Sequence, residues 1–237
     1  MKKITALLLA MIMSLALLTG CGQDGGDAAG EKGTLYVYCF GDYFDPQLEY
    51  QFEEETGYDV VVDLFDTNEE MYPVIKNNTA QYDVICASDY MIERLISEDL
   101  LAEINYDNVP NAANVADNIK PFMEGFDPGM VHSLPHTWGT YGIMYNTEMV
   151  NSEIDSWEDL WDPQYEGQIV MPNSMREGFM IGAKLLGYSM NTTSEEEISA
   201  ITDKLIEQKP LVYSFDNDSA REKMIGDSAA LAVITSG

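Results

Sequence analysis

The sequence has few basic residues. It carries 12 Lys and Arg against 41 Asp and Glu, which gives a formal net charge of −29. Nucleic acids and anionic lipid surfaces are bound through basic patches, so both are poor partners for this chain. A negative field concentrates cations near any cleft, but many exported proteins are acidic simply for solubility. The charge therefore favours a cationic ligand only weakly.

Histidine is also scarce, because only His132 and His136 occur and both lie in one short segment. No Cys and His spacing typical of a zinc site is present, so the sequence predicts neither a metal site nor a cofactor. HExxH, the nucleophile elbow and a Ser/His/Asp arrangement are absent too. We therefore expect no enzymatic activity. An exported hydrolase using a carboxylate pair such as Asp42 and Glu177 is the less favoured alternative.

Long hydrophobic runs are limited to one. After two lysines, an apolar run of about fifteen residues extends over 4–18, shorter than the ~20 residues of a transmembrane helix. The position of Cys21 after it resembles a lipobox, in which the cysteine is diacylated and becomes the mature N-terminus. The sequence predicts a lipoprotein signal peptide at 1–20, lipidation at Cys21, a flexible tether at 21–33 and an extracytoplasmic location at the membrane. An ordinary cleaved signal with an incidental cysteine is the alternative.

Only three cysteines occur, so lipidation of Cys21 leaves Cys39 and Cys86 as thiols. Both lie near the ends of predicted strands, and an exported protein could oxidise them if those strands are neighbours. We expect buried free thiols, because a cross-link between adjacent parallel strands demands unfavourable geometry.

Strands and helices alternate in the first half of the folded region. Apolar, β-rich runs predict strands at 34–40, 58–65 and 82–87. Helices are expected between Asp45 and Gly57, with Leu48 and Phe52 on one face, then over 69–77, and after a cap at Ser88. This alternation with short loops is typical of an α/β fold with a parallel sheet covered on both faces.

The second half is expected to form another lobe. The extended segment 127–146 is predicted to carry the chain from lobe 1, at 34–126, to lobe 2, at 147–237. Strands are predicted in lobe 2 at 168–171, 211–215 and 229–234. A capping box of Ser194 and Glu197 opens a helix that extends to about residue 208. Because the chain stops directly after an apolar strand, we expect lobe 2 to be incomplete.

The candidate site lies in three loops that follow predicted strands, since open parallel sheets bind ligands at the carboxyl ends of their strands. These loops supply aromatic rings, carboxylates and hydroxyls: Phe40, Asp42, Tyr43, Ser88, Asp89, Tyr90, Ser174 and Glu177. Carboxylates form charge-assisted hydrogen bonds with an alkylammonium, while aromatic faces attract the cation and cover its methylenes. The combination predicts a site for a small organic cation.

Each of these residues has an ordinary structural role as its alternative. The tyrosines can be core aromatics with a hydroxyl at the surface, and Ser88, Asp42 and Asp89 can be helix caps or solvated loop residues. Glu177 lies in the first turn of a predicted helix, where the macrodipole alone favours an acid. We expect Arg176 to form a structural salt bridge rather than to clamp a carboxylate ligand. Convergence at strand ends is what favours a binding site.

Several stretches resemble the polyamine-binding (spermidine/putrescine) lipoproteins of ATP-driven importers. The resemblance runs from the tether to the last residue and is carried by LYVYCFGDYFDPQLEYQFEEETGYDVVVDLFDTNEEMY, QYDVICASDYMIERL, HTWGTYGIMYN, SWEDLWDPQYEGQIVM and MREGFMIGAKLLGYSMNTT. It implies a two-lobed, type II periplasmic-binding-protein fold, with the ligand in the interlobe cleft and closure about a hinge on binding. It also implies putrescine or spermidine as the ligand and ABC permease subunits as partners.

The family's ligand contacts carry over unevenly. The aromatic residue, the acid and the tyrosine of the first loop fall on Phe40, Asp42 and Tyr43. The Ser-x-Tyr of the third strand's loop is kept as Ser88 and Tyr90. These five positions match the pattern, although Phe40 stands where tryptophan is common.

Other positions depart from the family. Of a pair of acids three residues apart only Glu177 is kept, because the other position is Ser174. Gly41 lacks a hydroxyl, and Ile234 stands where a cleft tryptophan is common. We expect Asp89 to replace the lost charge. Because of these departures, a different small cationic solute is an alternative ligand. Further alternatives are a binding protein of the same fold for a metal ion, a peptide or a carboxylate, and a surface adhesin or scaffold.

Overall fold

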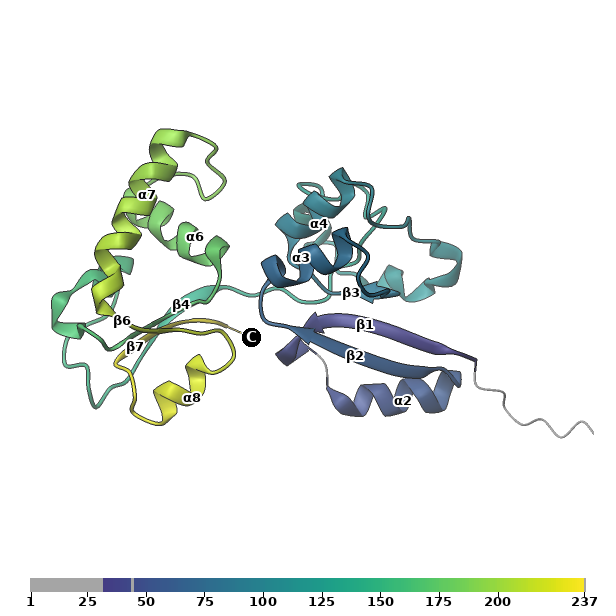
Figure 1. Cartoon of the computed structure of the whole chain (residues 1–237), viewed down its shortest axis with the longest axis horizontal. Helices are drawn as coiled ribbons and strands as arrows, with labels where there is room; N and C mark the ends of the chain where they lie inside the picture. The colour runs from purple at the N-terminus through teal and green to yellow at the C-terminus, as the bar shows by residue number, and fades with distance from the viewer. Residues whose placement is uncertain (1–31, 44, 237) are drawn as a thin grey trace, which may run out of the picture.

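The computed structural model describes residues 32–43 and 45–236, which form two lobes joined by an extended segment (Figure 1). One lobe contains a three-stranded sheet of order β2-β1-β3, and the other a four-stranded sheet of order β4-β7-β5-β6. The two-lobed α/β fold expected from the sequence is confirmed. The predicted signal peptide at 1–20 and the tether up to residue 31 lie outside the described residues.

Lobe 1 is built on a wholly parallel sheet. Its strands, in spatial order, are β2 (Asp59–Phe65), β1 (Thr34–Phe40) and β3 (Val84–Ile85). Helix α2 (Pro46–Thr56) covers one face, while α3 (Asn68–Lys76) and α4 (Asp89–Ser97) cover the other (Figure 1). Because all three strands are parallel, their carboxyl ends and the loops after them share one edge.

The ends of α2 are where the sequence places them. The Asp45 side chain accepts a hydrogen bond from the Gln47 N–H at 2.9 Å, and Gly57 ends the helix with a φ of 75°. The apolar side of the helix is not buried, because Leu48 and Phe52 are 54% and 40% exposed. Helix α2 therefore contributes no residue to the buried core of lobe 1.

The third strand is shorter than the predicted 82–87. The Asp83 carboxylate accepts the Tyr36 N–H at 2.9 Å, a position that a backbone carbonyl would take in a regular ladder. Strand pairing consequently starts at Val84 and is limited to two residues.

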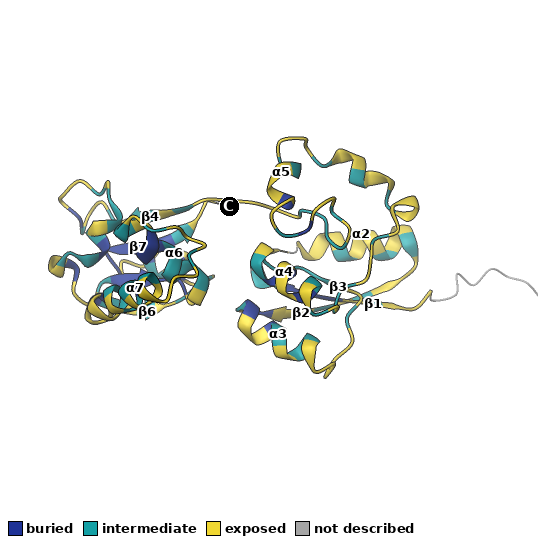
Figure 2. Ribbon diagram, turned by 90° about the horizontal axis from the view of Figure 1, so that it is seen from above, coloured by how far each residue is buried: buried dark blue, intermediate teal, exposed yellow. Residues whose placement is uncertain are grey.

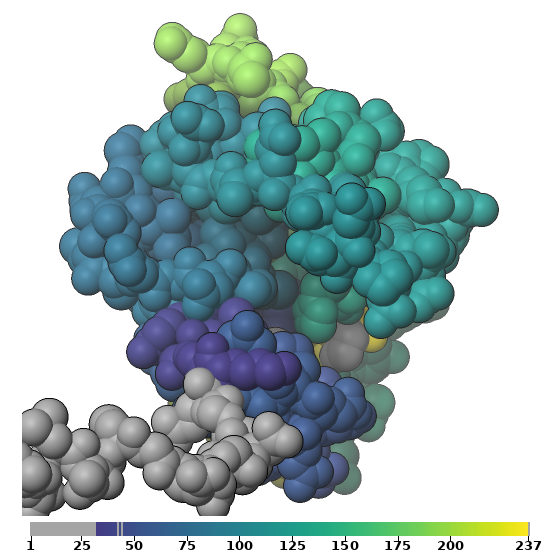
Figure 3. Space-filling view, turned by 90° about the vertical axis from the view of Figure 1, so that its right-hand side faces the viewer, coloured from purple at the N-terminus to yellow at the C-terminus, as the bar shows by residue number. Residues whose placement is uncertain are grey.

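A loop-rich segment completes lobe 1. It contains short helical turns at Tyr106–Asn108, Pro110–Asn114 and α5, Lys120–Met123. Figure 3 shows this teal segment beside the blue part of lobe 1. Asp127 is 2% exposed, and its carboxylate accepts the N–H groups of Val131, His132 and Ser133 at 2.7–3.1 Å. This buried carboxylate fixes the chain where it leaves for lobe 2.

Lobe 2 has a mixed sheet. Strands β5 (Ile169–Met171), β6 (Val212–Phe215) and β7 (Leu231–Thr235) are parallel, and β4 (Tyr141–Tyr145) pairs with β7 in the antiparallel sense. The helices are α6 (Met175–Leu186), α7 (Glu195–Gln208) and α8 (Ala220–Ile225). Shorter turns lie at Trp157–Trp161, Pro163–Tyr165 and Lys209–Leu211. The sheet places the carboxyl end of β5, and hence the start of α6, at the side that faces lobe 1.

The capping box predicted at the start of α7 is only half present. The Ser194 hydroxyl accepts the Glu197 N–H at 3.4 Å, which supports the predicted start of the helix. A reciprocal box occurs instead at Ser156, whose N–H donates to the Asp159 carboxylate at 3.0 Å.

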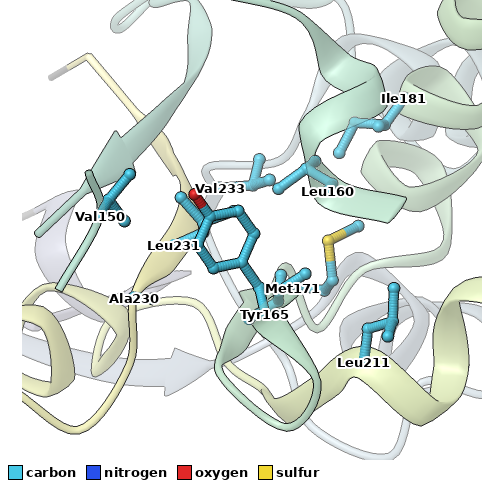
Figure 4. Packing of buried hydrophobic residues seen from close by; sticks show 10 residues of the cluster. Val150, Leu160, Tyr165, Met171, Ile181, Leu211, Ala230, Leu231 and Val233 are labelled. Atoms are coloured by element: carbon cyan, nitrogen blue, oxygen red, sulfur yellow. The ribbon is translucent and has the colours of Figure 1, made fainter. Parts of the chain in front are cut away.

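Each lobe has its own core. In lobe 2, side chains from β5, β7 and α6 converge on Leu160 and Tyr165 (Figure 4), and buried residues gather on its central strands (Figure 2). In lobe 1, Tyr38 and Phe65 of the sheet pack against Met71, Met91 and Leu95 of α3 and α4. No helix within the described residues is long and apolar enough to cross a bilayer.

Candidate ligand-binding site

Four side chains from both lobes surround one point at the edge of the lobe 1 sheet. Tyr43 follows β1, Tyr90 lies in α4 after β3, Tyr141 begins β4, and Glu177 lies in the first turn of α6. Burial raises the pKa of each of the three tyrosines, and the Glu177 carboxylate raises each pKa further. Tyr43, Tyr90 and Glu177, three of the predicted site residues, therefore come together, and Tyr141 joins them.

Glu177 is the central acid of this group. Its Oε1 accepts a hydrogen bond from the Tyr141 hydroxyl at 3.1 Å, whereas its buried Oε2 has no hydrogen-bond partner among the described residues. Burial raises the pKa of Glu177; the Tyr141 hydrogen bond opposes this rise, and the nearby Glu69 carboxylate adds to it. A buried carboxylate oxygen without a donor costs free energy, which a ligand N–H group would recover.

Asn68 positions the hydroxyls of lobe 1. It is 5% exposed, and its Nδ2 donates to Ser88 Oγ and to Tyr90 Oη, both at 3.0 Å. Its Oδ1 accepts the Ser88 N–H at 3.3 Å. The Tyr90 hydroxyl in turn donates to Glu69 Oε1 at 3.0 Å. Ser88 thus starts α4, but its hydroxyl bonds to Asn68 rather than to the helix.

Sequence reasoning missed Asn68, Glu69 and Tyr141. Asn68 and Glu69 begin α3, directly after β2. In a parallel sheet this loop lies at the same edge as the loops after β1 and β3, so strand order alone could have indicated it. Tyr141 had no such signal, because the hinge region reads only as extended chain.

The hydrogen bonds determine whether the site offers donors or acceptors to a ligand. A tyrosine hydroxyl can donate one hydrogen bond, and the hydroxyls of Tyr90 and Tyr141 donate theirs to Glu69 and Glu177. Both hydroxyl oxygens retain accepting capacity, and Glu177 Oε2 can only accept when ionised. The site therefore offers acceptors, and it suits a ligand that carries N–H donors and positive charge.

The remaining predicted residues differ in their placement. Phe40 packs against Phe65 and Tyr43, with ring centroids 4.4 and 5.1 Å apart. Asp89 is exposed, and its Oδ1 accepts the N–H of the adjacent Tyr90 at 2.7 Å; no described contact joins it to Glu177. Ser174 is the N-cap residue of α6.

Three further expectations concern the edges of the site. Asp42 lies in the turn Gly41–Tyr43, but its side chain is outside the described part of the chain. Ile234, expected at a cleft position, packs against a buried cluster of lobe 2. The salt bridge expected for Arg176 is wrong, because none of the ion pairs among the described residues includes it.

Arg176 contacts neutral groups instead. Its guanidinium donates to the Met190 carbonyl at 3.3 Å and to the Asn191 side chain. The guanidinium carbon lies 5.6 Å from the centroid of the Tyr90 ring, so a lobe 2 cation sits over a lobe 1 aromatic face. The Tyr90 ring is thus placed where it can attract a cation.

A cavity of about 500 Å³ adjoins the site between the lobes. Lobe 1 contributes Thr67 and Glu69 to its wall, and lobe 2 contributes Ser174 together with apolar side chains that include Phe179 and Phe215. The mainly apolar wall is suited to methylene groups.

The lobes also bond to each other beside the cavity. Asp66, at the end of β2, accepts hydrogen bonds from Asn173 Nδ2 at 2.8 Å and from Asn217 Nδ2 at 3.2–3.3 Å. The two asparagines are themselves joined, since the Asn173 N–H donates to Asn217 Oδ1 at 3.0 Å. Loops after three strands, one from lobe 1 and two from lobe 2, thereby form one network.

The described residues contain neither a cluster suited to a metal ion nor a disulfide. Within residues 32–43 and 45–236, no three His, Cys, Asp or Glu side chains are grouped so that they could hold a metal ion. Cys39 and Cys86 are both free, as expected; Cys39 is buried as predicted, but Cys86 is only partly buried.

Residues 80–236 match the family model of the bacterial extracellular solute-binding proteins. The chain belongs to this family. The first 123 residues of this solute-binding protein also match the model of a hypothetical lipoprotein family named after MG045.

Three individual proteins illustrate what this solute-binding protein is similar to. It is 32% identical over 213 residues to the spermidine/putrescine-binding periplasmic protein of Escherichia coli K12, covering 88% of this chain and 60% of that protein. A spermidine/putrescine ABC transporter substrate-binding protein of Streptococcus pneumoniae has a solved structure with a TM-score of 0.66 and 36% identity, over 86% of this chain and 62% of that one. A Treponema pallidum lipoprotein shares the fold, with a TM-score of 0.79 and 24% identity over 86% and 64% of the two chains. The chain thus spans about 60% of the length of the curated relatives it matches.

Proposed function

We propose that this solute-binding protein binds a polyamine, putrescine or spermidine, between its lobes, delivers it to the permease subunits of an ABC importer, and catalyses no reaction. The observation that carries the proposal is that the side chains around Glu177 offer hydrogen-bond acceptors rather than donors. Two tyrosine hydroxyls donate to carboxylates and a buried carboxylate oxygen has no donor, so the site favours a ligand that supplies N–H groups.

The surrounding residues support the same ligand class. We assign Phe40, Asp42, Tyr43, Ser88, Asp89, Tyr90, Ser174 and Glu177 to the site, with Tyr141 added from the geometry. Aromatic faces at Tyr43 and Tyr90 attract ammonium groups, and the adjoining apolar cavity accommodates methylenes. Relatives described as spermidine/putrescine-binding proteins agree with this chemistry.

We further propose that the ligand site opens and closes about the segment 127–146, between lobe 1 at 34–126 and lobe 2 at 147–237. Within this segment, β4 (Tyr141–Tyr145) would move with the lobe 2 sheet, because it is paired with β7. Cys21 would carry the lipid that holds the protein on the outer side of the membrane, and the match to a lipoprotein family supports this. Cys21→Ser should abolish the incorporation of a labelled fatty acid into the protein. Equal labelling of the variant and the wild type would contradict lipid attachment at Cys21.

The test of the ligand is calorimetric titration of the full-length protein, purified from membranes in detergent. Putrescine, spermidine and spermine are compared with 1,4-butanediol, which has the same chain length as putrescine but no charge. We expect saturable binding of a polyamine and none of the diol. Glu177→Gln, which retains the shape and the Tyr141 contact, should weaken binding at least ~10-fold, because it removes the buried charge.

Glu148→Gln serves as the matched control, since it removes one exposed carboxylate in the same lobe without touching the site. It should bind like the wild type. No heat with any polyamine, from protein that melts cooperatively, would reject the polyamine and leave another small cation as the alternative. That alternative has some support, because Ser174 and Ile234 depart from the residues common at their positions in polyamine-binding relatives.

A further inference from the structure

Glu69 contacts Tyr90 and also lines the interlobe cavity. It is the second residue of α3, and its Oε1 accepts a hydrogen bond from the Tyr90 hydroxyl at 3.0 Å. The same side chain lines the cavity of about 500 Å³, together with Ser174 from the other lobe. Glu69 is the one acid among the residues that line this cavity. It therefore connects the buried carboxylate of Glu177 to the apolar space beyond.

Glu69 and Glu177 belong to different lobes but influence each other. Burial is the main cause of the raised pKa of Glu177, and the Glu69 carboxylate raises that pKa further. Each of the two acids accepts a hydrogen bond from a tyrosine hydroxyl, and these bonds hold them at the site. Two like charges held in this way repel each other; the Arg176 guanidinium lowers the pKa of Glu177 and so offsets part of this effect, and a ligand cation beside the two acids would offset more of it.

The two acids differ in what surrounds them. Glu177 lies close to Tyr43, Tyr90 and Tyr141, and its Oε2 is buried without a hydrogen-bond partner among the described residues. Glu69 is exposed to the cavity, whose walls include Phe179 and Phe215. A ligand with one ammonium at Glu177 and a chain of methylenes along the cavity would bring a second ammonium near Glu69.

We propose that Glu69 is a further carboxylate of the site, acting together with Glu177, and that it selects cations with two or more ammonium groups over monoamines. The inference rests on the proposed function, because it assigns a role within the same site. Asp218 is a competing acid beside the site. Its Oδ2 lies 2.9 Å from the point where a β-carbon on Gly41 would stand, on the Tyr43 side of the site.

The experiment compares putrescine with n-butylamine, which has the same four-carbon chain and a single ammonium. Affinities are measured by calorimetry on the full-length protein and on the variants Glu69→Gln, Glu69→Asp, Glu70→Gln and Asp218→Asn. Glu70→Gln is the matched control, because it removes the same charge from the same helical turn. The glutamine oxygen can still accept the Tyr90 hydroxyl or, at position 70, the Asp66 N–H.

We expect Glu69→Gln to weaken putrescine binding at least ~10-fold and to leave n-butylamine within about 2-fold of the wild type. Glu69→Asp should recover part of the putrescine affinity, and Glu70→Gln should bind both amines normally. The inference is overturned if Glu69→Gln prefers putrescine over n-butylamine as strongly as the wild type does. It is also overturned if Glu69→Gln and Glu70→Gln lose putrescine affinity equally, or if only Asp218→Asn loses the preference for putrescine. Failure of the wild type to bind any polyamine would instead reject the proposed function itself. A thermal melt of each variant shows that it is folded.

Discussion

Asn173 Nδ2 donates a hydrogen bond of 2.8 Å to Asp66 Oδ2, and this bond joins lobe 2 to lobe 1 at the carboxyl ends of β5 and β2. Asn217 adds two contacts to the same aspartate, one of them to its backbone carbonyl. A hydrogen bond to a charged acceptor stabilises more than a neutral one. The network therefore favours the arrangement in which the lobes touch, and a ligand between them benefits from that arrangement.

Removal of this interlobe network should weaken ligand binding without altering the site. Asp66→Ala deletes all side-chain acceptors for Asn173 and Asn217, so the closed arrangement becomes less populated. Because the apparent dissociation constant scales inversely with the binding-competent fraction, we expect roughly 3- to 30-fold weaker polyamine binding. Stopped-flow measurements should place most of the change in the dissociation rate.

Asp59→Ala is the control for this variant, since Asp59 is an exposed acid at the opposite end of the same strand. It should bind like the wild type. Small-angle scattering should report a larger radius of gyration for ligand-free Asp66→Ala than for Asp59→Ala. Identical affinities and radii in the two variants would show that the Asp66 contacts do not hold the lobes together.

The buried charge of Glu177 should reduce the stability of the ligand-free protein. Its Oε2 has no donor among the described residues, so ionised Glu177 is held at a free-energy cost. Glu177→Gln removes the charge, and its amide can donate to a tyrosine hydroxyl. We expect the variant to bind polyamine at least ~10-fold more weakly but to gain about 1 kcal/mol of unfolding free energy, or ~2–4 °C in Tm. A lower Tm without ligand would contradict the assignment of Glu177 as a strained binding residue.

The raised pKa of Glu177 also predicts how binding depends on pH. An ammonium beside the carboxylate favours its ionised form, so binding lowers the pKa and releases a proton at acidic pH. Affinity should be highest above the ligand-free pKa and should fall as the pH drops through it. Over the same range the contribution of Glu177 to the stability of the ligand-free protein increases, because a carboxyl group with a raised folded pKa favours the folded state when protonated.

Titrations in buffers of different ionisation enthalpy measure the released protons. Glu177→Gln is the matched control, because it binds without a titrating group at this position, and its residual affinity should lose this pH dependence. Equal proton release by the wild type and Glu177→Gln would assign the titrating group elsewhere.

The sequence predicted the scaffold better than the contacts. Strand and helix order followed from local patterns, and Asp45 and Gly57 mark the limits of α2 as expected. Leu48 and Phe52 were placed on a common face correctly, but periodicity does not tell what covers that face, and both are exposed. The length of β3 depended on a long-range bond between Asp83 and Tyr36, which no local pattern reveals.

For the site, strand-end reasoning found residues that lie together, such as Tyr43, Tyr90 and Glu177. It missed Asn68, which positions Ser88 and Tyr90 through three hydrogen bonds and was not recognisable as a ligand contact from its residue type. Such contacts depend on the packing of α3 against α4, and packing is set by the whole core of the lobe. The same reason explains the wrong expectation for Arg176, whose neutral partners lie 14 and 15 residues further along the chain.

A surface network around Glu98 on lobe 1 should keep its ion pairs at moderately acidic pH. Glu98 accepts hydrogen bonds from Tyr72 and pairs with Lys76 at 2.9 Å and Arg94 at 3.2 Å. The Lys76 and Tyr72 contacts lower the pKa of Glu98 to about 2. Because the folded pKa is depressed, the stabilisation is present above the unfolded pKa of about 4.3 and is lost as the pH falls towards 2.

Carbon-13 NMR of the Glu98 carboxyl group measures this pKa directly. Lys76→Met should raise the pKa towards its ordinary value, while Lys120→Met, which breaks the unrelated pair with Asp117, should leave it unchanged. A Glu98 pKa near 4 in the wild type would mean that the network does not form in solution.

The Cys86 thiol should react slowly although it is only partly buried. Burial, with a smaller effect of the neighbouring Cys39, raises the pKa of Cys86 to about 11. Since the thiolate is the reactive form, alkylation by iodoacetamide at pH 8 should be much slower than that of free cysteine and should accelerate as the pH approaches 11. Mass spectrometry of the timed reaction separates Cys86 from the fully buried Cys39, which should stay unmodified in the folded protein. A Cys86 rate at pH 8 equal to that of free cysteine would show that the thiol is exposed to water, and that the edge of the sheet beside the proposed site is more open than the packing around Tyr43 indicates.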